Sequence, residues 1–343
     1  MRVAIVHRSA SMADLLAGIL RCEPEFSVAW RADTAEEAIL RCDEDPPDVA
    51  LVDTALDAPG AIEATRGMTG TSSVQVVLIS HHRSSDTRVI FEAMGAGAID
   101  VVESPAVSSV GTLEGVEALV RKLRAAASLA AGKPPSLDIG RARSTPGRDV
   151  ARWPKLVLIG ASTGGPSALV TVLGSLPASF DAPIVVVQHV DAQFSGDLAD
   201  WLRQQVPLPV VLARRGQAPR PGTITLTGTN DDLVMTAARQ FAFSRPVDGS
   251  FYHPSVDVFF ASVAHHWPIP GVATLLTGIG RDGASGMLAL RKKGWHTIAQ
   301  DQATSVVYGM PRAAAELGAA VEILPVDRIS GALQRALGTR PLA

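Results

Sequence analysis

Cysteine is scarce in this chain of 343 residues, which has only Cys22 and Cys42, both near the N-terminus. Two cysteines argue against a disulfide framework and against a cysteine metal cluster, so a reducing compartment is expected. No apolar run approaches the roughly 20 residues that a membrane-spanning helix needs. The first residues also lack the apolar core and cleavage site of a signal peptide. We therefore expect a soluble, cytoplasmic protein without membrane insertion.

The chain also lacks a strong charge of either sign. Lys and Arg together number 31, and Asp and Glu together number 34, for a net charge of -3. This balance provides no global field that would attract nucleic acid or an anionic membrane. The length exceeds that of one ordinary domain, and two domains are the simplest expectation.

Alternating apolar runs and helical patterns occur on both sides of a Pro- and Gly-containing segment. Residues 1–130 contain five strand-helix units, which predict a parallel sheet with helices on both faces. Residues 131–152 show no apolar periodicity and are expected to form a linker. Residues 153–343 alternate again and predict a second, doubly wound α/β/α domain. The run FAFSR at 241–245 could add a strand and make the second sheet mixed.

In the first half, the residues at the carboxyl ends of the expected strands are those that would form a site. They are His7, Arg8, Asp53, Ser80 and Ser104. This half resembles the flavodoxin-like receiver domains of two-component signalling, in which an aspartate after the third strand accepts a phosphoryl group. Asp53 and Ser80 match that pattern, but the acidic residues that would hold Mg²⁺ after the first strand are missing. Asp53 is therefore either a phospho-acceptor or a structural partner of Arg8.

In the second half, the sequence GASTGG follows a buried strand and precedes a helical pattern. Gly160 to Gly164 satisfy G-x-S-x-G in the strand-turn-helix context that a serine nucleophile needs. Free backbone N–H groups at the start of the helix could stabilise an oxyanion. Alternatively, Ser162 or Thr163 could cap the helix. A dinucleotide fingerprint is disfavoured, because Ser162 replaces its middle glycine and no acid ends the next strand.

A serine nucleophile needs a base and a group that orients the base. His189 ends the strand directly after the helix of Ser162, and a right-handed crossover places successive strand ends side by side. His253 remains an alternative base. Asp282 lies in a glycine-rich loop after another buried strand, where it could orient the histidine or cap the next helix. A metal loop at this position is disfavoured, since it lacks clustered carboxylates and suitable histidines.

These motifs, with PSVD at 254–257 and DQATSVVYGMP at 301–311, resemble the catalytic domain of the CheB chemotaxis methylesterases over most of residues 153–335. The resemblance implies a Ser162, His189 and Asp282 triad that hydrolyses glutamate γ-methyl esters on the cytoplasmic helices of chemoreceptors, in some members with glutamine deamidation. It implies no metal and no organic cofactor. The oxyanion donors implied are backbone groups of Thr163, Gly164, Gly165, Ile279 and Gly280.

The resemblance is weakest on regulation. In the family, an unphosphorylated receiver covers the hydrolase site, and phosphorylation by a chemotaxis histidine kinase relieves the inhibition. With its degraded acidic site, this chain would be controlled by a binding event at a pseudo-receiver, or would run unregulated. The alternative to an enzyme is a CheB-like scaffold that modulates receptor arrays without catalysis. A third reading is an esterase of small molecules.

Overall fold

The computed structural model describes residues 1–56, 59–71, 74–81, 87–107, 113–131, 153–245 and 254–338. The chain divides into two compact units, Met1–Ile139 and Gly140–Ala343. That division falls inside the predicted linker, of which residues 132–152 lie outside the described residues. The domain boundaries drawn from the sequence therefore remain a prediction.

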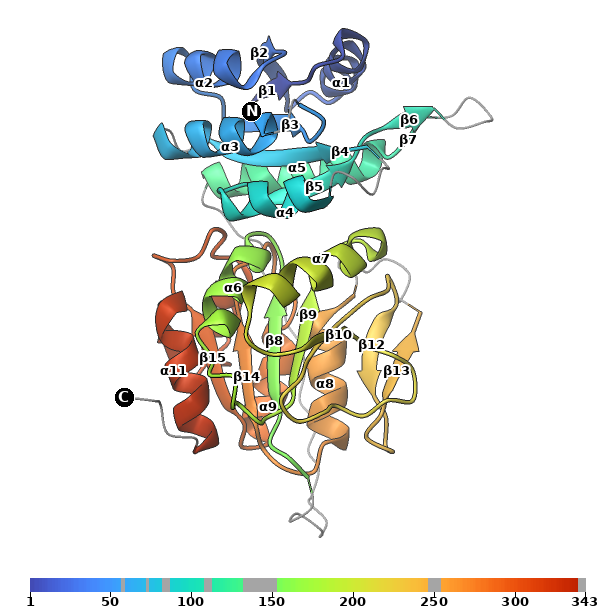
Figure 1. The fold of residues 1–343 in the computed structure, drawn as a ribbon, viewed down its shortest axis with the longest axis vertical. Coiled ribbons are helices and arrows are strands. Elements are labelled where there is room, and N and C mark those ends of the chain that lie inside the picture. The colour runs from blue at the N-terminus through green and yellow to red at the C-terminus, as the bar shows by residue number, and fades with distance from the viewer. Residues whose placement is uncertain are drawn as a thin grey trace. The chain divides into compact units, whose positions relative to one another are not determined.

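Unit 1 contains a five-stranded parallel sheet in the order β2-β1-β3-β4-β5 (Figure 1), which is the flavodoxin-like order. Each predicted strand and helix of this half is present. The strands are β1 Arg2–Val6, β2 Ser27–Ala32, β3 Val49–Asp53, β4 Gln75–Ser80 and β5 Asp100–Glu103. The helices are α1 Ala10–Cys22, α2 Ala35–Glu44, α3 Gly60–Thr71, α4 Thr87–Gly95 and α5 Val116–Ala131. A short antiparallel pair, β6 Ala106–Val107 and β7 Leu113–Glu114, was not predicted.

Alternate strand residues of unit 1 face opposite layers of helices. Val3, Ile5 and Leu51 belong to a core shared with Leu16 of α1 and Leu119 of α5. Intervening residues of β1 and β3 are also fully buried, on the other face. A parallel sheet covered on both faces explains why these strands read as short unbroken apolar runs.

Unit 2 contains a seven-stranded sheet in the order β10-β11-β9-β8-β14-β15-β16, and all its neighbouring strands pair in parallel. Its strands are β8 Val157–Ala161, β9 Ile184–Gln188, β10 Val210–Leu212, β11 Ile224–Leu226, β14 Val272–Leu275, β15 His296–Gln300 and β16 Glu322–Leu324. The expectation of a mixed sheet was wrong. Residues 241–244 form β13, which pairs antiparallel with β12 Asp232–Met235 in a separate hairpin.

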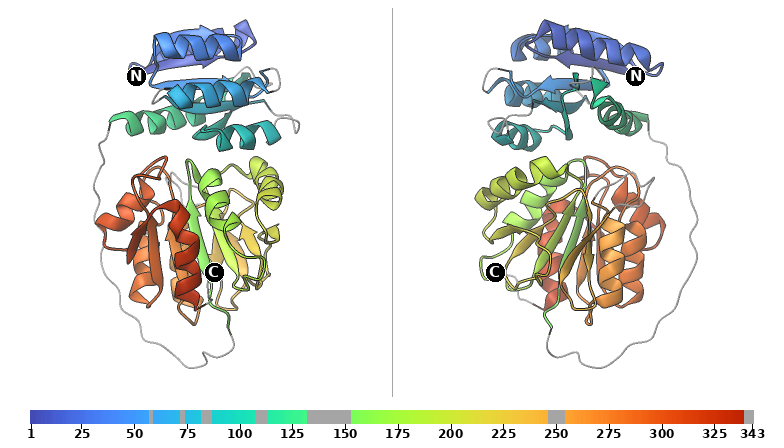
Figure 2. Two further views of the ribbon diagram at one scale, coloured as in Figure 1. Left: turned by 60° about the vertical axis from the view of Figure 1, so that its left-hand side comes forward. Right: turned by 90° about the vertical axis from the view of Figure 1, so that its right-hand side faces the viewer.

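Helices cover both faces of the unit 2 sheet (Figure 2). They are α6 Gly165–Gly174, α7 Ala192–Gln205, α8 Val256–His266, α9 Ala284–Lys292, α10 Met310–Glu316 and α11 Val326–Leu337. Helix α11 packs against α6, whereas α8 packs against α9. Strands β12 and β16 and helix α11 were not predicted from the sequence. Within the described residues, no helix combines the length and apolar character needed to cross a membrane.

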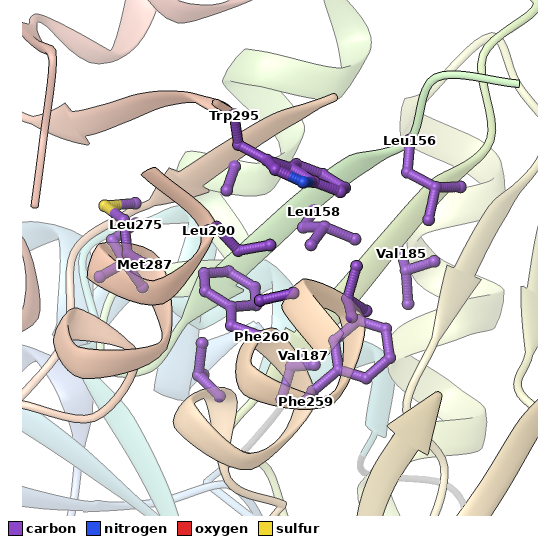
Figure 3. Packing of buried hydrophobic residues seen from close by; sticks show 14 of the residues in the cluster. Leu156, Leu158, Val185, Val187, Phe259, Phe260, Leu275, Met287, Leu290 and Trp295 are labelled. Atoms are coloured by element: carbon purple, nitrogen blue, oxygen red, sulfur yellow. The ribbon is translucent and has the colours of Figure 1, made fainter. Parts of the chain in front are cut away.

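A buried apolar core lies between the unit 2 sheet and the helices α8 and α9. Figure 3 shows Leu158 and Val187 of the central strands packed with Phe260 of α8 and with Met287 and Leu290 of α9. All five side chains are fully buried. This packing holds the N-terminal ends of α8 and α9 close to the carboxyl ends of β8, β9 and β14.

Candidate active site

Ser162 lies directly after β8, at the carboxyl end of the sheet. Its side chain is largely buried, with the residue 8% exposed, and its N–H donates to the carbonyl of Thr277 at 3.0 Å. The turn into α6 depends on Gly164, which has φ +75° and is the N-cap of that helix without a side-chain cap. Neither Ser162 nor Thr163 is therefore the N-cap, and the capping alternative is wrong for both.

The strand register places His189 beside Ser162. Ala161 pairs with Gln188 in the β8–β9 ladder, and the N–H of His189 donates to the carbonyl of Ala161 at 3.0 Å. Neighbouring strands are about 4.8 Å apart, so the residues that follow this pair are adjacent. The Nε2 atom of His189 lies 2.7 Å from Oδ2 of Asp282. The strand register thus puts His189 next to Ser162 along the backbone, and the side chain of His189 contacts Asp282 from the loop after β14.

Asp282 is held by the first turn of α8 rather than by its own helix. Its carboxylate accepts hydrogen bonds from the Ser255 hydroxyl at 2.9 Å and from the N–H groups of Val256 and Asp257 at 2.6 and 2.9 Å. Burial raises the pKa of Asp282, but the hydrogen bonds from His189 and from this backbone outweigh burial and leave the pKa below its usual value. The carboxylate is therefore ionised at neutral pH.

A second carboxyl group, that of Asp257 in α8, accepts a hydrogen bond from α9, the helix that follows Asp282. Its Oδ1 accepts from the N–H of Gly286, in the first turn of α9, at 2.6 Å. Burial and, to a smaller extent, the negative charge of Asp282 raise the pKa of Asp257 to about 7, against backbone hydrogen bonds from the start of α9 that lower it. Asp282, just before α9, thus bonds to the start of α8, and Asp257 of α8 bonds to the start of α9; near neutral pH Asp282 is ionised, whereas Asp257 is partly protonated.

The glycine-rich loop after β14 presses against the serine. A Cβ atom added to Gly278 would lie 2.8 Å from Cβ of Ser162 and 2.3 Å from Sδ of Met310. Thr277 ties this loop to its neighbours, because its hydroxyl donates to the Thr163 carbonyl at 2.9 Å and accepts from the N–H of Val307 at 2.8 Å. This close approach explains why a glycine is needed at position 278, which a helix-capping role of Asp282 would not explain.

Some of the expected oxyanion donors already donate a hydrogen bond within the described part of the protein, and others do not. The N–H of Gly165 donates to the carbonyl of Ser162 at 2.7 Å, so it closes the turn and is not available to a substrate. The same carbonyl accepts from Nε2 of Gln188 at 2.8 Å. Among the described residues, no acceptor is found for the N–H groups of Ile279 and Gly280. These two groups are the better candidates on the β14 side.

Unit 2 contains four histidines besides His189, of which His253 is the alternative base expected from the sequence. His253 lies outside the described residues. His296 pairs instead with Glu322, with 2.6 Å between Nε2 and Oε1. His265 and His266 stack on each other in the last turn of α8, at 4.5 Å between ring centroids.

In unit 1, the strand ends gather a different set of side chains around Asp53. His7 Nδ1 lies 3.4 Å from Oδ2 of Asp53, and His81 Nε2 lies 3.3 Å from Oδ1. The expected Arg8 pair is replaced by these two histidines, and Arg8 is exposed. Burial lowers the pKa of His7 despite the nearby Asp53 carboxylate. One carboxylate between two imidazoles does not fit Mg²⁺, which requires oxygen ligands.

Several site residues escaped the sequence reading. Ser255 and Asp257 lie in the PSVD segment, and Thr277 lies in the TGIGRDG loop, but no pattern within either segment predicts that they meet. Gln188 directly precedes His189, and its position as a polar residue at the end of an apolar strand is the one signal that could have indicated its contact with Ser162.

Fold and geometry together define a two-unit α/β protein whose second unit places a serine next to a histidine–aspartate pair. The sequence model of the CheB methylesterase family matches residues 157–333. This chain belongs to the CheB methylesterase family.

Relatives and a solved structure agree with that assignment. The protein-glutamate methylesterase/protein-glutamine glutaminase 2 of Cupriavidus metallidurans is 43% identical, covering 98% of this chain and 99% of the relative. The protein-glutamate methylesterase/protein-glutamine glutaminase of group 3 operon of Pseudomonas putida is 41% identical, covering 97% and 98%. The CheB methylesterase catalytic domain of Thermotoga maritima is 34% identical with a TM-score of 0.51, covering 53% of this chain and 98% of that structure.

Proposed function

We propose that this protein is a cytoplasmic protein-glutamate methylesterase whose nucleophile is Ser162, with His189 as the base and Asp282 as the residue that orients it. The observation that carries the proposal is the pair of His189 and Asp282, with 2.7 Å between Nε2 and Oδ2. His189 follows β9, the strand that pairs with the strand before Ser162. Relatives that match nearly the whole chain are named for this activity and for glutamine deamidation.

The pairing of Nε2 with Asp282 supports a different proposed role for each ring nitrogen of His189. Because Nε2 pairs with Asp282, Nδ1 is the atom that takes the proton from the Ser162 hydroxyl. Ser162 Oγ attacks the ester carbonyl, and the tetrahedral intermediate collapses as His189 returns the proton to the leaving methoxide. Water then attacks the acyl-enzyme, again with His189 as base, and releases the glutamate carboxylate. With a glutamine substrate, ammonia leaves in place of methanol.

Charge placement supports this sequence of steps. The protonated imidazole that forms during attack is stabilised by the ionised Asp282, which four hydrogen bonds hold in one orientation. The developing oxyanion is stabilised by the backbone N–H groups of Ile279 and Gly280, which have no acceptor among the described residues.

The substrate proposed is a methylated glutamate on the cytoplasmic helices of a chemoreceptor. Control by a chemotaxis histidine kinase through Asp53 is not part of the proposal, since the surroundings of Asp53 do not fit the Mg²⁺ that phosphoryl transfer needs. An input other than phosphorylation at unit 1, or constant activity, fits the residues better.

The test measures three quantities with one preparation of the full-length chain: methanol released from methylated receptor, hydrolysis of a simple methyl ester, and binding to the receptor helices. We expect methanol release from the receptor at a kcat/KM far above that for the simple ester. Binding to receptor helices without methanol release would instead establish a scaffold. Turnover of the simple ester alone would establish a small-molecule esterase.

A further inference from the structure

The carboxyl ends of β1, β3 and β4 bring two histidines and one aspartate together, in unit 1 and outside the proposed active site. One ligand atom from each of His7, Asp53 and His81 lies within 4.8 Å of the others. His7 and Asp53 are buried, and His81 is half-buried. We propose that His7, Asp53 and His81 bind a divalent transition-metal ion such as Zn²⁺. The proposal is independent of the esterase function.

The separations in this cluster differ from those of the hydrogen-bonded histidine–carboxylate pairs elsewhere in the chain. His189–Asp282 and His296–Glu322 are 2.7 and 2.6 Å apart. In the cluster, the corresponding separations are 3.4 Å for His7 and 3.3 Å for His81. Two ligands that share a tetrahedral Zn²⁺ at about 2.0–2.1 Å are about 3.3–3.4 Å apart, the length of one tetrahedron edge. Each histidine is thus at that distance from one oxygen of Asp53, Oδ2 for His7 and Oδ1 for His81, and the three residues can bring one ligand atom each within 4.8 Å of the others.

Asp53 and the two rings are held in place before any ion binds. The N–H of Ala55 donates to Oδ1 of Asp53 at 2.9 Å, which fixes the carboxylate. The His7 and His81 rings meet edge to face, with 5.4 Å between centroids. Such support is what a binding site needs, because ligands already oriented lose little freedom when the ion arrives.

The hydrogen bonds of His7 leave its ring incompletely satisfied. Its Nδ1 accepts from the N–H of Ser9 at 3.0 Å, and its buried Nε2 has no hydrogen-bond partner among the described residues. The hydrogen bond from Ser9 puts the lone pair on Nδ1, the ring nitrogen that faces Asp53, and leaves the single proton of the neutral imidazole on Nε2. An ion at Nδ1 would replace the hydrogen bond from Ser9, and Nε2 would keep its proton.

The ligand types select the class of metal. Two imidazole nitrogens and one carboxylate suit Zn²⁺, Co²⁺, Ni²⁺ or Cu²⁺, whereas Mg²⁺ and Ca²⁺ prefer oxygen ligands. Three protein ligands leave the fourth position of a tetrahedral ion for water or for an external ligand. The strand ends that hold Mg²⁺ in a receiver would thus hold a different ion here.

The experiment titrates Zn²⁺ into the full-length chain, freed of metal with a chelator, in a calorimeter. We expect one Zn²⁺ per chain and no comparable heat with Mg²⁺. His81→Ala and Asp53→Asn should each weaken Zn²⁺ binding by about 100-fold or more, since each removes a ligand. Co²⁺ bound to the wild-type chain should give the strong visible absorption of a tetrahedral site, and both variants should lose it.

His296→Ala is the matched control, because its side chain is 30% exposed and paired with a carboxylate, against 33% for His81. It should bind Zn²⁺ as the wild type does. Circular dichroism checks that each variant is folded, and Asp53→Asn, which preserves side-chain size, gives a reading that does not depend on His81→Ala. Absence of stoichiometric Zn²⁺ binding, or equal affinity in wild type, His81→Ala and Asp53→Asn, would overturn the proposal.

Discussion

At the scale of single residues, the orientation of His189 depends on one carboxylate. Asp282→Asn replaces one carboxylate oxygen with an NH₂ group that cannot accept from His189 or from the α8 backbone. We expect kcat for methanol release to fall by about 10⁴-fold with a small change in KM, because the imidazole takes the wrong tautomer. Asp327→Asn, an exposed substitution on α11, is the control. Equal kcat values in the two variants would remove Asp282 from the mechanism.

Asp257 gives a prediction about stability and pH. Its pKa of about 7 in the folded chain lies above the ordinary 3.8, so the folded state binds more protons between these values. Stability therefore falls as the pH rises from about 4 to about 7, by up to about 4 kcal/mol at about 1.4 kcal/mol per unit.

Asp257→Asn should remove that loss, because the amide does not ionise and its oxygen can still accept from the N–H of Gly286. Urea unfolding of both proteins at pH 4 and pH 7 measures the difference. Parallel pH dependence in wild type and variant would show that Asp257 does not carry the proton.

The residue types of the site could be predicted from the sequence, but their partners could not. Ser162, His189 and Asp282 each follow an apolar strand, and strand ends meet at one edge of a parallel sheet. The hydrogen bonds from the start of α8 to Asp282 form only when α8 packs on α9. Val256, one of the donors, is 26 residues away from Asp282 in the sequence. The same limit hid the association of His7 with His81.

At the scale of elements, the loop after β14 sets the space around the nucleophile. Gly278→Ala would place a methyl group 2.8 Å from Cβ of Ser162, so the loop or the serine must move. We expect a large loss of kcat and a destabilisation of about 1–3 kcal/mol from overpacking. Gly196→Ala is the control, since the added methyl in α7 meets nothing within 4 Å and should be neutral or slightly stabilising. A fully active Gly278→Ala would show that this loop does not constrain Ser162.

Elements with a strong apolar period were predictable, and those without it were missed. The central strands β8, β9 and β14 are buried throughout and stand out as apolar runs. The edge strand β16 is only partly buried, and β6 and β7 contain two residues each, too few for any periodicity. Helix α11 is the exception, because it was not predicted although it has an apolar stripe that includes Ile329, Ala332 and Leu333.

At the scale of the whole molecule, unit 2 has a core of its own. The cluster around Leu158, Phe260 and Met287 draws all its members from residues 156–319. We therefore expect residues 153–343 to fold alone, with a cooperative thermal transition, and to release methanol at least as fast as the full-length chain. A rise on truncation would show inhibition by unit 1, and equal rates would show none. A folded but inactive fragment would contradict the assignment of the complete active site to unit 2.

The division into two units followed from the sequence because the Pro- and Gly-containing segment interrupts two α/β patterns. The sequence did not predict the signal to which unit 1 responds. The missing acidic residues after the first strand indicate only that Mg²⁺ is disfavoured. His81 and His7 change that account by supplying nitrogen ligands where a receiver has oxygen.

The most direct test of the central claim is the rate of methanol release from methylated receptor by wild type, Ser162→Ala and Ser175→Ala. Ser175 is an exposed serine at the end of α6 and serves as the control. We predict that Ser162→Ala lowers the rate by about 10⁴- to 10⁶-fold, while Ser175→Ala stays near the wild type. A Ser162→Ala rate within a few-fold of the wild-type rate would contradict Ser162 as the nucleophile.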